Sequence, residues 1–151
     1  MDVKYELERR YNLIKFEISM LEEQMKTVDD EAMPSLTPSY SGMPNGKGGT
    51  SDKVFNTVVK MVSNKERLQN LINQKQARLK SLEMLIGTQS HKAQRIIQAR
   101  ALEGKDFCTV ANELKQKEGI DIYSTSYCKE LYYKSMKNMQ DIANNLESED
   151  N

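Results

Sequence analysis

Apolar residues in the N-terminal half of the chain recur at alternating steps of four and three. The first series consists of Leu7, Tyr11, Ile14, Ile18, Leu21, Met25 and Val28. This spacing places the apolar side chains along one stripe of an α-helix and is typical of coiled coils. It predicts a coiled-coil helix over residues 1–32, with the stripe facing a second helix.

A second series with the same alternation follows. Its members are Val54, Val58, Met61, Lys65, Leu68, Ile72, Lys75, Leu79, Leu82 and Ile86. The two lysines lower stability, and such polar residues can fix the register or the number of paired helices. With Ser51 or Asp52 as the N-cap and Gly87 as the C-terminal stop, the series predicts a second coiled-coil helix over residues 51–87.

Residues 33–50 separate the two helices and contain all three prolines and four of the seven glycines. This composition buries too little apolar surface to offset the entropy of ordering, so we expect a flexible loop. Within it, Gly46-Lys47-Gly48 resembles part of a phosphate-binding loop. That motif requires Gly, four residues and then Gly-Lys-Ser/Thr after a strand, which this chain lacks, so we interpret the segment as a linker.

The loop is long enough for the two helices to fold back as an antiparallel hairpin. They can equally pair with the helices of a second copy, and the sequence leaves both arrangements open. We call the two apolar series the seam and expect it to support homo-oligomerisation rather than to act only as a spacer. The residues assigned to this role are Leu7, Tyr11, Ile14, Ile18, Leu21, Met25, Leu68, Ile72 and Leu79.

The heptad pattern stops after Gly87, and residues 90–146 are predicted to form two short helices and a long one. The residues expected to cap or end them are Ser90, Glu103-Gly104, Asp106, Gly119 and one residue of 124–126. Three helices joined by glycine-containing turns have the layout of a helix-turn-helix module. The acidic tail, residues 147–151, is expected to be disordered.

Apolar spacing also predicts which side of the last two helices faces the core. The residues expected inside are Phe107, Cys108, Val110, Ala111, Leu114, Cys128, Tyr132, Ser135, Met136, Met139 and Ile142. The opposite face of the last helix carries Tyr127, Lys129, Glu130, Tyr133, Lys134 and Lys137. Lysines can contact phosphates, and tyrosine hydroxyls and a carboxylate can contact phosphates or base edges.

This outward face is therefore the predicted DNA-binding surface, with Arg100 and Lys105 as further candidates for phosphate contacts. The alternative is that the lysines form an ordinary solvated surface of a simple three-helix bundle.

The overall charge of zero conceals an uneven distribution: residues 1–33 carry five basic and nine acidic side chains, whereas residues 51–84 carry seven basic and three acidic side chains. Residues 92–137 carry nine and six, and a basic middle between acidic ends is compatible with a polyanionic partner.

Little in the composition supports enzyme chemistry. His91 has no Cys, Asp or Ser around it at motif spacing, and Cys108 and Cys128 form neither a disulfide framework nor a four-ligand zinc site. We therefore expect no catalytic residues, no metal, no cofactor and no small-molecule substrate. Apolar runs are far shorter than the roughly 20 residues of a membrane span, and residues 1–10 are too charged for a signal peptide, so a cytoplasmic protein without a membrane partner is expected.

Residues 94–114 resemble the opening of a helix-turn-helix of the sigma-factor region 4 type. The matching residues are Arg100, Leu102, Glu103, Gly104, Val110, Ala111 and Leu114. The parts that precede them are a heptad helix, a Ser/Pro/Gly loop and a second long helix. Over residues 5–146 this order resembles that of ArpU/RinA-type phage late-gene transcriptional regulators. The turn at residues 115–125 is longer than the compact turn of the family.

Pattern and resemblance together predict an all-α fold, with long antiparallel coiled-coil helices followed by a C-terminal helix-turn-helix module of three helices. The resemblance implies a late-gene activator that binds double-stranded DNA in the cytosol of a bacterial host. Its coiled coil would form a homo-oligomer or engage RNA polymerase. The alternative is a helical adaptor that binds a host or phage protein through the coiled coil and touches no nucleic acid.

Overall fold

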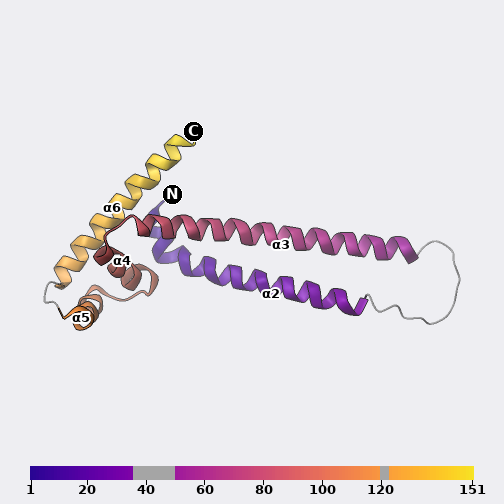
Figure 1. The fold of residues 1–151 in the computed structure, drawn as a ribbon, viewed down its shortest axis with the longest axis horizontal. Helices are drawn as coiled ribbons and strands as arrows, with labels where there is room; N and C mark the ends of the chain where they lie inside the picture. The colour runs from indigo at the N-terminus through magenta and orange to yellow at the C-terminus, as the bar shows by residue number, and fades with distance from the viewer. Residues whose placement is uncertain (36–49, 120–122) are drawn as a thin grey trace. The chain divides into compact units, whose positions relative to one another are not determined.

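The computed structural model describes residues 1–35, 50–119 and 123–151, with side chains outside residues 30–54 and 120–122 (Figure 1). The helices are α1 (Val3–Tyr5), α2 (Tyr11–Ser35), α3 (Thr50–Gly87), α4 (His91–Ile97), α5 (Phe107–Glu118) and α6 (Thr125–Glu149). Two π-helical turns, η1 (Glu6–Arg10) and η2 (Gln98–Leu102), continue α1 and α4. The described residues contain no strand, and the predicted all-helical class is confirmed.

The segment expected to be a loop, residues 33–50, is described only at its two ends. The α2 helix continues through Ser35, and α3 begins at Thr50. Residues 36–49, with the expected flexible linker, lie outside the described residues.

The chain divides into two compact units. Unit 2 comprises residues 16–76, and unit 1 comprises residues 1–15 together with residues 77–151. The sequence suggested that residues 90–146 form a module of their own. In unit 1 the first residues of the chain join that module, because α1 packs on α6 and η1 packs on η2.

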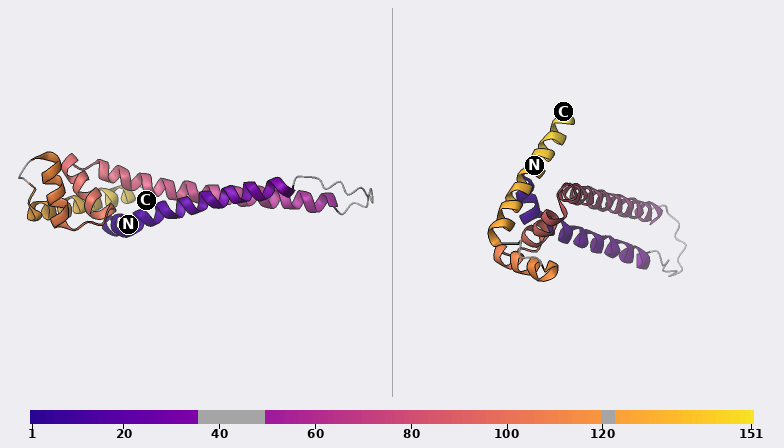
Figure 2. Two further views of the ribbon diagram at one scale, coloured as in Figure 1. Left: turned by 90° about the horizontal axis from the view of Figure 1, so that it is seen from below. Right: turned by 60° about the vertical axis from the view of Figure 1, so that its left-hand side comes forward.

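In unit 2 the α2 and α3 segments run side by side in opposite directions (Figures 1 and 2). The Lys75 ammonium pairs with the Glu17 carboxylate, and the Lys65 Nζ atom lies 2.7 Å from Asp29 Oδ1. The residue number rises from Glu17 to Asp29 in α2 and falls from Lys75 to Lys65 in α3, which is the order expected for antiparallel helices. Both lysines of the seam thus form ion pairs with acidic residues of α2.

In unit 2 the seam residues assigned to oligomerisation lie between the two helices of one chain, whereas Val58 of the same series is exposed. Ile18, Leu68 and Ile72 are buried, and Leu21 and Met25 are half-buried. In unit 1 the remaining residues assigned to oligomerisation, Leu7, Tyr11, Ile14 and Leu79, are also buried. Self-association through these nine residues would therefore require contacts within the chain to open.

Local signals begin the C-terminal helices, and end α5, where the sequence predicts. The side chains of Ser90, Asp106 and Ser124 accept hydrogen bonds from the backbone N–H three residues further on, which satisfies one unpaired donor of each helix start. Gly119 ends α5 with a φ of 64°, a left-handed conformation that glycine adopts without strain.

The core of unit 1 is built largely from the residues expected inside. Buried side chains come from α4 and η2 (Ala93, Ile96, Ile97, Ala101), α5 (Val110, Ala111, Leu114) and α6 (Cys128, Tyr132, Ser135, Met136, Met139, Ala143). Phe107 and Ile142 are only half-buried. The prediction for Cys108 was wrong: its side chain is exposed, because a helical position two residues before Val110 points away from the face that Val110 buries.

The expected disorder of the acidic tail is also corrected in part. The α6 helix runs through Glu149, so residues 147–149 are helical. The Ser148 hydroxyl donates to the carbonyl of Asn145 at 2.8 Å, and the Asn151 amide donates to the carbonyl of Glu147 at 3.0 Å. Because no glycine or proline interrupts this stretch, nothing in the sequence ends the helix at residue 146.

Candidate nucleic-acid interface

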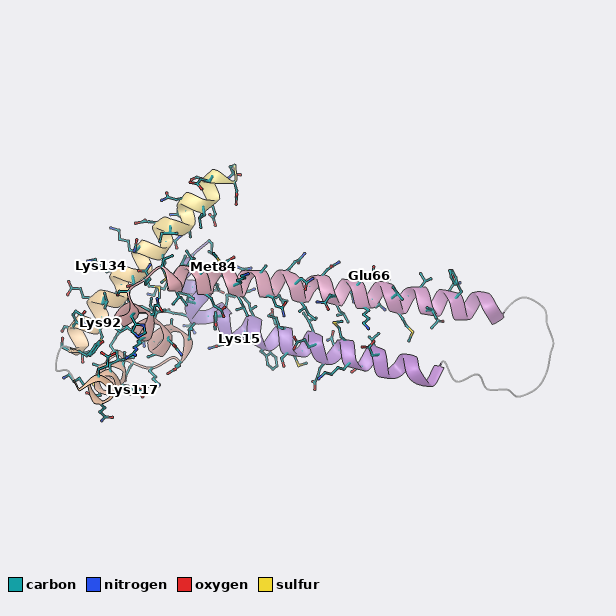
Figure 3. All side chains as sticks on the ribbon, viewed as in Figure 1. Lys15, Glu66, Met84, Lys92, Lys117 and Lys134 are labelled. Atoms are coloured by element: carbon teal, nitrogen blue, oxygen red, sulfur yellow. The ribbon has the colours of Figure 1, made fainter. Side chains whose placement is uncertain are left out.

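One face of α6 carries most of the residues predicted to contact DNA. Lys129, Glu130, Tyr133, Lys134 and Lys137 are all exposed, and their spacing places them on one side of the helix. We call these five residues the outer face of α6. Figure 3 shows Lys134 on α6, with Lys92 on α4 and Lys117 on α5. The opposite side of α6 is buried in the core, which holds the helix and orients its outer face.

Tyr127 differs from the outer face because it is half-buried at the start of α6. Its backbone N–H donates to the Ser124 hydroxyl oxygen at 3.0 Å, and its ring packs edge-to-face on Tyr123 with centroids 6.1 Å apart. The Tyr123 hydroxyl in turn donates to Glu118 Oε2 at 2.6 Å. Burial and the neighbouring carboxylate raise the pKa of Tyr123 to about 12, since both disfavour the phenolate.

Tyr133 is partly exposed, and neighbouring side chains pack against its ring. Its ring lies 5.5 Å from that of Tyr132 and 6.1 Å from that of Phe107, measured between centroids. The Lys4 ammonium lies 5.1 Å from the centroid of the same ring. These contacts limit the side-chain freedom of Tyr133, and 44% of the residue remains open to solvent.

The two further candidates for phosphate contacts are engaged within the chain. The Lys105 ammonium lies 2.7 Å from Glu103 and 2.8 Å from Glu113, and these hydrogen bonds raise the pKa of Lys105. The Arg100 guanidinium donates to the carbonyl of Lys105 at 3.0 Å and lies 4.7 Å from the Phe107 ring centroid. Two carboxylates compensate the charge of Lys105, and a backbone carbonyl and an aromatic ring hold the Arg100 side chain, so neither residue belongs to the outer face of α6.

N-terminal residues that the sequence does not predict to be near α6 hold this helix in place. The Tyr132 hydroxyl donates to Glu8 Oε1 at 2.6 Å, and the backbone N–H of Val3 donates to Gln140 Oε1 at 2.9 Å. Burial and the Glu8 carboxylate raise the pKa of Tyr132. The sequence indicates only that a buried tyrosine needs an acceptor for its hydroxyl group. It does not indicate which residue provides that acceptor.

A surface groove of about 620 Å³ borders the outer face of α6. Lys134, Lys137, Asn138 and Asp141 line it from α6, and residues 88–90, which connect α3 to α4, line it from the other side. The Asn138 amide donates to Gln89 Oε1 at 3.3 Å and so links the two walls.

The remaining chemistry-bearing residues lie apart from one another. His91 is exposed, and burial raises the pKa of the Cys128 thiol. Within the described ranges, no three His, Cys, Asp or Glu side chains come together in a way that could hold a metal ion. No helix of the described part of the chain is long and apolar enough to span a bilayer.

No family model matches the chain, and no curated protein or solved structure matches it either.

Proposed function

We propose that this chain is a sequence-specific, DNA-binding transcriptional regulator that uses α6 as its recognition helix. The observation that carries the proposal is the outer face of α6, where three exposed lysines and one glutamate surround Tyr133. A cationic helix face of this kind suits the phosphate backbone and base edges of a DNA major groove.

The packing of unit 1 supports this use of α6. A helix that reads DNA must be held at a fixed angle while one face stays free. Here α5 precedes α6 in the sequence, and α4, α5 and the N-terminal α1 all pack on α6. We assign α5 and α6 to a helix-turn-helix module, with the lysines contacting phosphates and the first turns of α6 contacting bases.

The resemblance of residues 94–114 to sigma-factor region 4 and of residues 5–146 to ArpU/RinA-type regulators supports the biological part of the proposal. By that resemblance the chain is a phage or prophage late-gene activator that acts as a homo-oligomer in the bacterial cytosol. RNA polymerase is then the protein partner. Because the nine seam residues assigned to oligomerisation are buried or half-buried within one chain, we do not base oligomerisation on them.

A helical adaptor is the second candidate, and a specific observation favours it. Phe55, Val58, Val59 and Val62 of α3 are exposed although they are apolar. Their spacing of three and four places them on one helix face, and protein partners often bind such a row of anchors. An adaptor would use this row and would show no affinity for duplex DNA.

Binding to duplex DNA as a function of salt separates the two candidates. A selection from random duplexes first identifies a preferred sequence. We expect the logarithm of its affinity to fall linearly with the logarithm of salt concentration, because each phosphate contact releases a counterion. Absence of duplex affinity at low salt would favour the adaptor.

A matched pair of double variants locates the contact. Replacing Lys134 and Lys137 by Ala should weaken binding to all duplexes and flatten the salt slope by about two units, roughly one for each lost contact. Replacing Lys60 and Lys80 by Ala removes the same charge from exposed positions of α3 and should leave the slope nearly unchanged. Equal effects of the two double variants would contradict the role of α6.

A further inference from the structure

The groove beside the outer face of α6 has the composition of an anion site. Its lining includes two lysines, Lys134 and Lys137, and one acidic residue, Asp141. The ammonium groups of these two lysines can donate hydrogen bonds. No carboxylate neutralises their charge as strongly as Glu103 and Glu113 neutralise that of Lys105. The groove therefore combines positive charge with a concave shape.

The wall opposite α6 adds polar groups that can donate hydrogen bonds. The Ser90 hydroxyl oxygen accepts from the backbone N–H of Ala93, which leaves its O–H free to donate into the groove. The Asn138 amide uses one N–H for Gln89 and retains a second. Buried Gln89 also donates to the Thr88 hydroxyl oxygen at 2.9 Å, a bond within this wall, and the Asn138–Gln89 bond joins the wall to α6.

We infer that this groove binds a phosphodiester of the duplex that α6 reads, and that the connection at residues 88–90 is a second point of contact with the DNA backbone. The inference rests on the proposed function and extends it from one helix to a clamp of two elements. Backbone contacts from outside the recognition helix fix the register of that helix on the duplex.

Asp141 provides the test, because it is the acidic member of the groove. It lies one helical turn after Lys137, close enough to offset the charge of that lysine. Asp141→Lys turns an unfavourable charge into a phosphate contact. If a phosphodiester occupies the groove, the salt slope becomes steeper by about 0.9 and the affinity at roughly 0.1 M salt rises about tenfold.

Glu149→Lys is the matched control. It makes the same change of charge on the same helix, at an exposed position that is not part of the groove. We expect Glu149→Lys to change the affinity less than twofold and to leave the slope unchanged. Circular dichroism of both variants checks that the helix content is retained.

A charge-relocation experiment makes the test independent of a general gain in positive charge. Lys137→Ala should weaken duplex binding, and adding Asp141→Lys to it should restore most of the lost affinity, whereas adding Glu149→Lys should not. Equal behaviour of the two lysine variants would overturn the groove site while leaving α6 as the recognition helix. A parent protein that binds no duplex would overturn both the groove site and the proposed function.

Discussion

The Tyr132 hydroxyl donates a 2.6 Å hydrogen bond to Glu8 Oε1 and so joins the last helix of the chain to the first helical segment. The Tyr132 ring is almost fully buried and packs edge-to-face on Phe107, with centroids 5.4 Å apart. One side chain therefore connects α5, α6 and η1 behind the outer face of α6. The position of that face depends on this contact.

Tyr132→Phe isolates the hydrogen bond because the ring is kept. We expect the free energy of unfolding to fall by about 1–3 kcal/mol, since the half-buried Glu8 carboxylate loses its donor. Urea denaturation followed by circular dichroism measures the change. Tyr133→Phe removes a hydroxyl from the exposed neighbouring ring and should change stability by less than about 0.5 kcal/mol. Similar losses for both variants would contradict the structural role of Tyr132.

Stability should also decline at alkaline pH through Tyr123. Its pKa is raised from 10.0 to about 12 in the folded chain. Between these values the unfolded chain has released the phenol proton while the folded chain still holds it, so the free energy of unfolding falls as pH rises. Tyr123→Phe should lessen this decline relative to Tyr5→Phe, a change at an exposed tyrosine. Urea midpoints measured from pH about 9 to about 12 test the difference.

The residues that the sequence located correctly are those whose signals are local. The N-caps Ser90, Asp106 and Ser124 act on backbone groups three residues away, and the buried side of α6 follows from helical periodicity. Both signals can be found within one or two turns of a helix. For this reason the amino-acid sequence alone is enough to assign the outer face of α6.

The contacts that the sequence did not reveal join distant parts of the chain. The buried Glu6 carboxylate receives two hydrogen bonds from Arg78, at 3.0 and 2.6 Å, although the heptad pattern places Glu6 outside the seam. The π-helical turn η1 contains Glu6 and changes the phase of the helix, an effect that apolar spacing does not encode. Lys105 is a local exception: its charge suits a phosphate contact, but its ammonium pairs with Glu103 and Glu113 in the folded chain.

The two cysteines should differ in reactivity. Cys108 is exposed, whereas Cys128 is buried and its raised pKa reduces the amount of reactive thiolate. We expect a thiol-specific reagent to modify one cysteine rapidly in the folded protein and the second only upon unfolding. Cys108→Ser should abolish the rapid phase. Rapid modification of a thiol in that variant would show that Cys128 is accessible.

A charge in the seam should destabilise the single chain rather than separate two copies. Ile18→Asp buries a carboxylate between α2 and α3 and should lower the free energy of unfolding by several kcal/mol. Ser19→Asp, at the exposed next position, should have little effect. The loss caused by Ile18→Asp should be the same at all protein concentrations. A loss that grows with protein concentration would show that the seam pairs between copies.

Sequence preference should be controlled by the first turns of α6. Lys129 and Glu130 are exposed there, and the N-terminal part of a recognition helix usually enters the major groove. Lys129→Ala and Glu130→Ala should therefore change which duplexes are selected, whereas Lys134→Ala should weaken binding to all duplexes alike. Selection from a random duplex library with each variant measures the preference. Helix content should match the parent protein, because these side chains lie outside the core. An unchanged preference in both Lys129→Ala and Glu130→Ala would remove base contacts from this part of the helix and restrict α6 to phosphate binding.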